Sequence, residues 1–224
     1  MAYLAIASDF DGTIAIKGQV ADSTRQAIAQ WREAGGKFLI VTGRLFDQGF
    51  DHLTGTFPQI WDYCDGVVAE NGALVYLRDR DQKILLGAAP PPEFMQALAA
   101  RGVDYLFHGE VIVATREPYL KTTQTLITEM TIDAQIILNK GEVMILPQGV
   151  NKAAGLSLLL KELQIAPEQV VAVGDAENDY DLINLCGYGV AVANALPQLR
   201  EIADLVTIGI CGEGVVELID RLLA

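Results

Sequence analysis

Short apolar runs that are rich in β-branched residues recur along the chain and predict the strands of a sheet. They lie at residues 3–8, 37–42, 66–70, 170–174, 189–193 and 204–208. Within each run the apolar residues are nearly continuous rather than alternating, which is typical of strands that are buried on both faces. Such strands occupy the middle of a sheet that helices cover on both sides.

Helical patterns separate several of these runs. The clearest spans residues 23–34, where Ser23 and Gln26 have the spacing of a capping box and Gly35 follows as a stop signal. Its apolar stripe consists of Ala27, Ile28 and Trp31. A second helix is predicted over residues 151–163. This alternation predicts an α/β fold with a doubly wound, mostly parallel sheet, in which ligands bind beyond the carboxyl ends of the strands.

The alternation stops in the middle of the chain, where two hairpins are predicted. Residues 73–87 and 134–147 each read as two short strands around a polar turn, and a Pro-Pro-Pro run follows the first hairpin. We therefore expect residues 88–147 to form a small α+β domain inserted into a core domain of residues 1–87 and 148–224.

Composition and charge disfavour two classes of partner, nucleic acids and membranes. Of the 224 residues, 51% are hydrophobic, and 16 Lys and Arg against 29 Asp and Glu give a net charge of -13. A negative surface repels phosphate backbones and anionic lipids, so we expect neither nucleic acid nor membrane as a partner. No basic segment precedes the first apolar run, and no apolar run reaches about 18 residues, so a cytoplasmic protein is expected. The sequence leaves open whether it is a monomer or a homodimer.

Three cysteines, Cys64, Cys186 and Cys211, lie far apart and form no C-x-x-C pair. An odd number at such spacings favours neither a disulfide framework nor a zinc site.

Two aspartates follow directly on the first predicted strand. Residues two apart on a strand share a face, so Asp9 and Asp11 should emerge side by side, before Gly12 lets the chain turn. Two close carboxylates suit either a metal site or a division of labour between a nucleophile and an acid. An ordinary turn with a solvated second acid is the structural alternative.

Three further sets of polar residues are expected at the same edge of the sheet, at the ends of two other strands and at the start of a helix. Thr42, Gly43 and Arg44 end the second strand, and Asp175, Asn178, Asp179 and Asp181 follow a later one. The first set suits a phosphate group, and the second offers the oxygen ligands that Mg²⁺ prefers. Lys152 begins a predicted helix behind Asn151, the expected N-cap. Each group, taken alone, is also explained by an ordinary turn or helix start.

Together these groups resemble a known family. D-x-D-G-T, T-G-R, a lysine beyond the insertion and G-D-x-x-N-D resemble, in this order, the four motifs of the haloacid dehalogenase superfamily of aspartate-nucleophile phosphohydrolases. The place of the insertion and the run E-N-G-A-L at residues 70–74 are similar to the Cof-like, sucrose-phosphate and archaeal phosphoglycolate phosphatases, which carry an α/β cap. Two departures are Phe10, where leucine is commoner, and the shortness of the insertion.

The resemblance implies a mechanism and its residues. Asp9 would be the nucleophile that forms an aspartyl-phosphate, and Asp11 the general acid and base. Mg²⁺ would be held by Asp9, Asp11 through its backbone carbonyl, and Asp175, with Asp179 or Asn178. Thr42 and Lys152 would bind the phosphoryl oxygens, and Gly43 and Arg44 are further candidates for substrate binding. The substrate would be a small phosphorylated metabolite, such as a sugar phosphate or phosphoglycolate.

Other functions use similar residues. A phosphotransferase or phosphomutase would use the same nucleophile with a sugar acceptor. A receiver-like signalling module also has an Asp cluster and a lysine, but it needs neither a 60-residue insertion nor an acid two residues after the nucleophile. Dinucleotide binding is disfavoured because no G-x-G-x-x-G follows the first strand. Within the insertion, the candidates for contact with the substrate are Tyr105, His108, Arg116 and Lys121.

Overall fold

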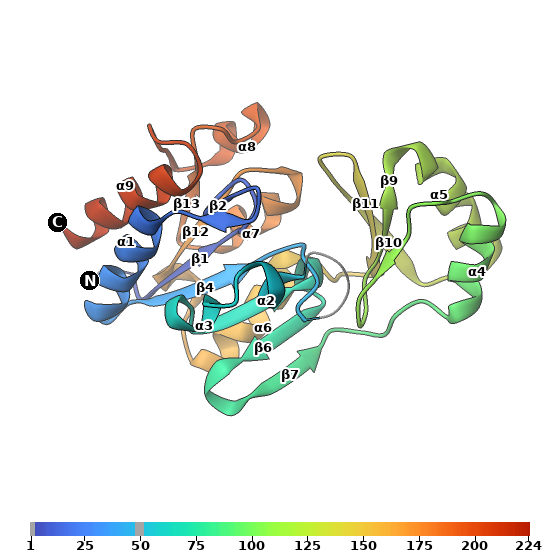
Figure 1. The fold of residues 1–224 in the computed structure, drawn as a ribbon, viewed down its shortest axis with the longest axis horizontal. Helices are drawn as coiled ribbons and strands as arrows, with labels where there is room; N and C mark the ends of the chain where they lie inside the picture. Colours follow the sequence, from blue (N-terminus) through green and yellow to red (C-terminus); the bar gives the residue numbers. More distant parts are fainter. Residues whose placement is uncertain (1–2, 48–51) are drawn as a thin grey trace.

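The computed structural model describes residues 3–47 and 52–224, and within them an eight-stranded sheet forms the larger part of the molecule (Figure 1). Its strand order is β14 (Leu205–Val206), β13 (Tyr188–Ala191), β12 (Val170–Gly174), β1 (Ala5–Ser8), β4 (Lys37–Val41), β5 (Gly66–Ala69), β6 (Leu74–Leu77) and β7 (Gln82–Leu85). The first six are parallel, and β6 and β7 add to one edge as an antiparallel hairpin. The predicted fold class is confirmed.

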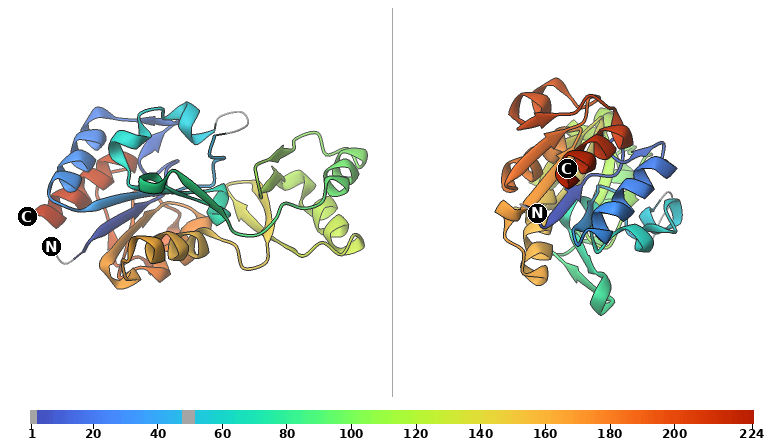
Figure 2. Two further views of the ribbon diagram at one scale, coloured as in Figure 1. Left: turned by 90° about the horizontal axis from the view of Figure 1, so that it is seen from below. Right: turned by 90° about the vertical axis from the view of Figure 1, so that its left-hand side faces the viewer.

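Helices cover both faces of this sheet. Figure 2 shows α1 (Asp22–Glu33) and α9 (Cys211–Leu223) on one side, and α6 (Lys152–Leu163) on the other. Shorter helices complete the large part of the molecule: α2 (Leu53–Thr56), α3 (Ile60–Tyr63), α7 (Tyr180–Leu185) and α8 (Pro197–Ile202). Every residue of β1, β5 and β12 is buried, which explains why their sequences are continuously apolar.

The first predicted helix forms, but its predicted capping box is wrong. The stripe of α1 is buried as expected, yet the helix begins at Asp22, and its N-cap Ala21 makes no side-chain hydrogen bond. Ser23 therefore lies inside the first turn. The Asp22 carboxylate occupies that turn and pairs with Arg25, and a negative charge there is favoured by the helix dipole. A small antiparallel pair, β2 (Ala15–Ile16) and β3 (Gln19–Val20), leads into the helix.

A second, four-stranded antiparallel sheet stands beside the first in the part of the chain that the structure describes (Figures 1 and 2). Its order is β10 (Ala134–Asn139), β11 (Glu142–Pro147), β9 (Val113–Arg116) and β8 (Phe107–His108). The helices α4 (Pro92–Ala100) and α5 (Leu120–Glu129) pack on it around an apolar core that includes Phe94, Leu126 and Ile145. Both predicted hairpins are present, and the second turns at Lys140 and Gly141, each with positive φ. No helix of residues 3–47 and 52–224 is long and apolar enough to span a membrane.

Candidate active site

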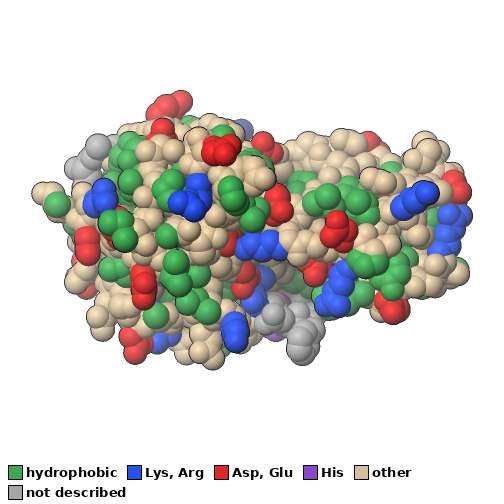
Figure 3. All heavy atoms as spheres, turned by 90° about the horizontal axis from the view of Figure 1, so that it is seen from above, with side chains coloured by type: hydrophobic (Ala, Val, Ile, Leu, Met, Phe, Trp, Pro, Cys, Tyr) green, Lys and Arg blue, Asp and Glu red, His purple; other side chains and the backbone are tan. Residues whose placement is uncertain are grey.

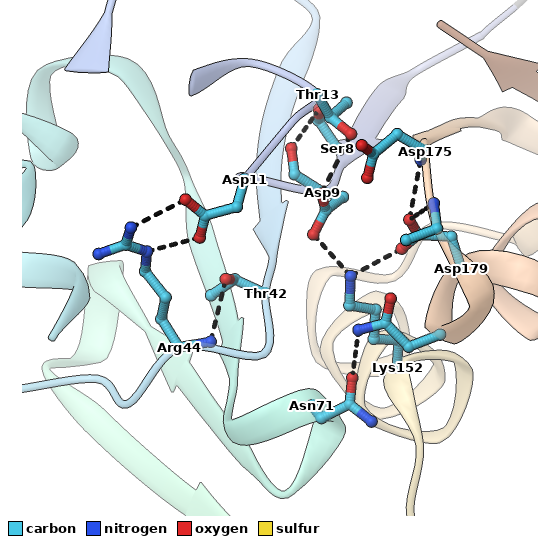
Figure 4. A network of polar contacts seen from close by, with 12 residues as sticks. Ser8, Asp9, Asp11, Thr13, Thr42, Arg44, Asn71, Lys152, Asp175 and Asp179 are labelled. Carbon is cyan, nitrogen blue, oxygen red and sulfur yellow. Dashed lines mark hydrogen bonds and ion pairs between the residues drawn. The ribbon is translucent and has the colours of Figure 1, made fainter. Parts of the chain in front are cut away.

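The structure brings the predicted polar groups together at the carboxyl edge of the large sheet (Figure 4). They come from the ends of three neighbouring strands, β4, β1 and β12, and from the start of α6. The residues that line a cavity at this edge include Asp9, Asp11, Thr42, Gly43, Arg44, Asp175 and Asn178, while Lys152 and Asp179 lie buried beside it. Parallel strands place their carboxyl ends at one edge, so residues distant in sequence meet there.

Lys152 is the cation at the base of this site. Its side chain is 1% exposed, and its Nζ donates to Asp9 Oδ1 at 2.6 Å and to Asp179 Oδ1 at 2.7 Å. Asn151 caps α6 by accepting a hydrogen bond from the backbone N–H of Ala154, as predicted, which fixes where the lysine leaves the helix. Burial would lower the pKa of Lys152, but the carboxylates of Asp179 and Asp9 outweigh it and raise that pKa.

Asp9 is a buried carboxyl group in a crowded acidic environment. Oδ2 accepts a hydrogen bond from Thr13 Oγ1 at 3.0 Å, and Oδ1 accepts the bond from Lys152. Burial, together with the charges of Asp179 and Asp175, raises the pKa of Asp9 to about 7 against the opposing effect of Lys152. A further cation bound beside Asp9 would therefore lower this pKa.

The same carboxylates form a candidate metal site. Oxygens of Asp9, Asp175 and Asp179 lie within 4.8 Å of one another. Asp175 Oδ1 is buried and has no hydrogen-bond partner among the described residues, so this oxygen is available to bind a cation. Asp179, by contrast, uses both oxygens: Oδ1 binds Lys152, and Oδ2 accepts from the backbone N–H groups of Asp175 and Ala176. This arrangement fits a divalent cation held by Asp9 and Asp175, with Asp179 orienting the loop.

Asp11 is turned away from Asp9 and towards Arg44. The guanidinium donates from Nε to Asp11 Oδ2 at 2.6 Å and from Nη2 to Oδ1 at 2.8 Å, a bidentate pair that Figure 4 shows. Arg44 also donates to Thr56 Oγ1, and its backbone N–H donates to Thr42 Oγ1. Arg44 therefore lines the cavity and also binds Asp11, the residue that the sequence predicts to be the general acid.

Lys140 is a site residue that sequence reasoning missed. It lies in the turn between β10 and β11, and its Nζ donates to Asp175 Oδ2 at 2.6 Å. Burial would lower the pKa of this lysine, but the bond to Asp175 raises it overall. The sequence predicts a turn at Asn139-Lys140-Gly141. No local feature of the sequence indicates that this turn reaches the large sheet.

The cavity itself lies between the two sheets and has a volume of about 350 Å³. Its wall on the side of the small sheet consists of Tyr105, Phe107, Ile112, Ala114, Asn139, Glu142 and Met144. Of the four residues predicted within the insertion, Tyr105 lines the cavity, and the Arg116 guanidinium lies 3.4 Å from the centroid of its ring. In Figure 3, Lys and Arg side chains lie among acidic ones where the large and small parts of the molecule meet.

Known proteins resemble this chain in sequence and in fold. The family model of haloacid dehalogenase-like hydrolases matches residues 6–131 and 111–219. A phosphoglycolate phosphatase of Saccharolobus solfataricus is 33% identical over 98% of this chain and 92% of its own, and one of Methanothermobacter thermautotrophicus is 32% identical over 98% of each. A haloacid dehalogenase-like hydrolase from Bacteroides thetaiotaomicron has the same fold, with a TM-score of 0.83 at 20% identity, over 98% of this chain and 99% of its own.

Proposed function

Since the chain belongs to the haloacid dehalogenase-like hydrolases and is a phosphatase, we propose that it hydrolyses a small phosphorylated metabolite through a phosphoryl group carried on Asp9. The observation that carries this proposal is the position of Lys152. Its buried ammonium lies between Asp9 and Asp179 at the base of a cavity lined by Thr42 and Asp175. The proposed nucleophile Asp9, the ammonium of Lys152 and the carboxylate of Asp175 thus lie together at the base of the cavity.

In the first half of the reaction, a carboxylate oxygen of Asp9 attacks the phosphorus atom. A bond between Asp9 and phosphorus forms while the ester bond to the leaving oxygen breaks, and protonated Asp11 gives its proton to that oxygen. In the second half, a water molecule attacks phosphorus, Asp11 takes its proton, and the bond to Asp9 breaks to release phosphate. For both steps the Asp11 carboxyl group turns from Arg44 towards the cavity.

The remaining residues bind and orient the phosphoryl group. Lys152 and the hydroxyl group of Thr42 would contact its oxygens, and the lysine would offset the negative charge that collects there. The buried, unpartnered Asp175 Oδ1 supports a Mg²⁺ site at Asp9 and Asp175, with Asn178 and the Asp11 carbonyl as further oxygen ligands. When bound, the ion would ease the approach of an anionic substrate to an anionic nucleophile.

The substrate is proposed to be a small phosphomonoester, with phosphoglycolate as the first compound to test. Two features support this choice: relatives over 30% identical are phosphoglycolate phosphatases, and the cavity of about 350 Å³ suits a small molecule. We further propose that residues 88–147 act as a cap domain, whose wall faces the leaving group, over a core of residues 1–87 and 148–224.

Phosphate release by the purified protein tests the proposal. We expect hydrolysis of 2-phosphoglycolate, glucose 6-phosphate and p-nitrophenyl phosphate to differ in kcat/KM, with activity that requires Mg²⁺ and is lost in excess chelator. Rapid acid quenching during turnover should trap protein-bound phosphate in the wild type. Failure to release phosphate from a broad panel of phosphomonoesters, or full activity in chelator, would contradict the proposal.

A further inference from the structure

The buried carboxylate of Glu70 takes no part in the proposed reaction. Glu70 follows β5 at the sheet edge that bears the active site, and the residue is only 2% exposed. Its Oε1 accepts a hydrogen bond from the backbone N–H of Glu110 at 2.9 Å, and Oε2 accepts from Val111 at 2.9 Å and Ile112 at 3.0 Å. A buried carboxylate needs several such donors. Here all three belong to the turn between β8 and β9, in the inserted segment.

This turn is shaped around the carboxylate. Gly109 begins it, and its backbone N–H donates to the Ile112 carbonyl at 2.9 Å. A Cβ atom added at Gly109 would lie 2.3 Å from Glu70 Oε1 and 2.4 Å from its Cδ, closer than real Cβ contacts. The absence of a side chain at residue 109 thus allows the turn to approach the carboxylate.

The backbone that carries Glu70 is strained and is tied to the active-site loops. Glu70 and Asn71 have φ of 51° and 53°, in the left-handed region that residues other than glycine rarely adopt. Their N–H groups donate to the carbonyls of Arg44 and Thr42, respectively. Asn71 Oδ1 also accepts a hydrogen bond from Asn178 Nδ2 at 2.8 Å. One strained turn therefore holds two site loops on one side and the inserted segment on the other.

An apolar cluster accompanies these hydrogen bonds. It joins residues of the large part to residues of the insertion and consists of Ala73, Val111, Ile112, Met144, Leu146 and Val150. Val111 and Ile112, whose N–H groups bind Glu70, are buried within it. Apolar burial excludes water from this contact and so strengthens the hydrogen bonds to the carboxylate.

We propose that Glu70 is a positioning residue that anchors the turn of residues 109–112 to the core and so fixes one wall of the substrate cavity. Ile112 lies in this turn, and the turn joins the strands that bear Phe107 and Ala114; all three side chains line the cavity. The inference rests on the proposed function, because it assigns to this wall the contact with the leaving group. Glu70 thereby governs substrate selection rather than chemistry at phosphorus.

The substitution Glu70→Gln tests this role, because glutamine keeps the size but removes the charge and turns an NH₂ group towards N–H donors. We expect kcat/KM for 2-phosphoglycolate to fall about 10- to 100-fold, mainly through KM, whereas kcat/KM for p-nitrophenyl phosphate changes less than about threefold. Hydrogen exchange of the amides of residues 110–112 should accelerate about tenfold or more.

Two variants on the other side of the contact complete the test. Gly109→Ala places a methyl group against the carboxylate without changing any charge, so it should reproduce both effects of Glu70→Gln. Glu110→Gln is the matched control. It alters the ion pair with Lys83 at the surface but keeps the backbone N–H that Glu70 binds, so it should behave like the wild type.

Wild-type exchange at residues 110–112 in Glu70→Gln would overturn the proposal, and so would equal losses of kcat/KM for both substrates. Faster exchange, together with a loss confined to 2-phosphoglycolate, would support it. If the wild-type protein released no phosphate from either compound, the proposed function would fail. The exchange comparison would then still decide whether Glu70 anchors the turn.

Discussion

The ammonium of Lys152 binds two carboxylates, so its single positive charge is divided between Asp9 and Asp179. Asp9 and Asp179 each contact it within 2.7 Å, and Asp175 adds a third carboxylate close by. Burial and the charges of Asp179 and Asp175 keep the pKa of Asp9 high although Lys152 opposes them, and a bound divalent cation would lower it. A nucleophile that is partly protonated at neutral pH is a poor one, which is why a divalent ion suits this arrangement.

Replacement of the proposed nucleophile is the most direct test at this scale. Asp9→Asn should reduce kcat to below about 1% of the wild-type value, because the amide keeps the shape but is a weak nucleophile. Circular dichroism should show an unchanged fold. The matched control is Asp79→Asn, an exposed residue outside the cavity, which should keep full activity. Substantial turnover by Asp9→Asn, free of deamidated protein, would remove Asp9 from this role.

The raised pKa of Asp9 also predicts how pH affects stability in the metal-free protein. Its folded-state pKa of about 7 exceeds the ordinary 3.8, so its contribution to the free energy of unfolding is greatest below about pH 4 and is lost as pH rises towards 7. The loss is about 4 kcal/mol at most. In chelator, the Tm of the wild type should therefore fall relative to that of Asp9→Asn between pH 5 and pH 8. Parallel Tm curves would refute this.

At the scale of elements, the strand ends explain how much could be predicted from the sequence. Asp9, Thr42 and Asp175 each follow a buried parallel strand directly, so a local apolar pattern was enough to place them at one edge. The N-cap before Lys152 placed that lysine in the same local way. The positions of these residues could therefore be predicted without knowing how the insertion packs on the core.

The residues that were missed depend on that placement. Lys140 and Glu70 each act across the contact between the insertion and the core, through partners 35 or more residues away in sequence. The bidentate pair of Arg44 with Asp11 likewise depends on the packing of two loops. Hydrophobic periodicity predicts single helices and strands. It does not indicate which turn of the small sheet faces the large sheet.

The β10–β11 turn gives a prediction of its own. Lys140 donates to Asp175 Oδ2, so it competes with a cation at that carboxylate. Lys140→Met should tighten Mg²⁺ binding, measured by calorimetry without substrate, by up to about fivefold, since a half-exposed ion pair is worth about 1 kcal/mol or less. Lys140→Arg retains the charge and should bind Mg²⁺ like the wild type. Weaker binding by Lys140→Met would mean that the lysine assists the metal site.

At the scale of the whole molecule, the two connections of the insertion lie together. A Cβ atom added at Gly87 would lie 2.7 Å from Pro147 Cγ, so a short Gly-Ser linker can replace residues 88–147. Without the wall that includes Tyr105 and Phe107, the variant should hydrolyse p-nitrophenyl phosphate slowly and lose discrimination among small metabolites. A folded variant that ranks these substrates like the wild type would contradict the proposed role of the cap.

The pairing of β1 with β12 has a consequence for the order in which the chain acquires structure. β1 lies between β4 and β12 in the sheet, and the bond from Lys152 to Asp9 joins residues 143 positions apart. Contacts of such long range form late, because the intervening chain must first close a large loop. The hairpin of β10 and β11 closes locally. During synthesis the insertion can therefore begin to fold while β1 still lacks its second neighbour β12, and the active site is completed only after β12 has formed.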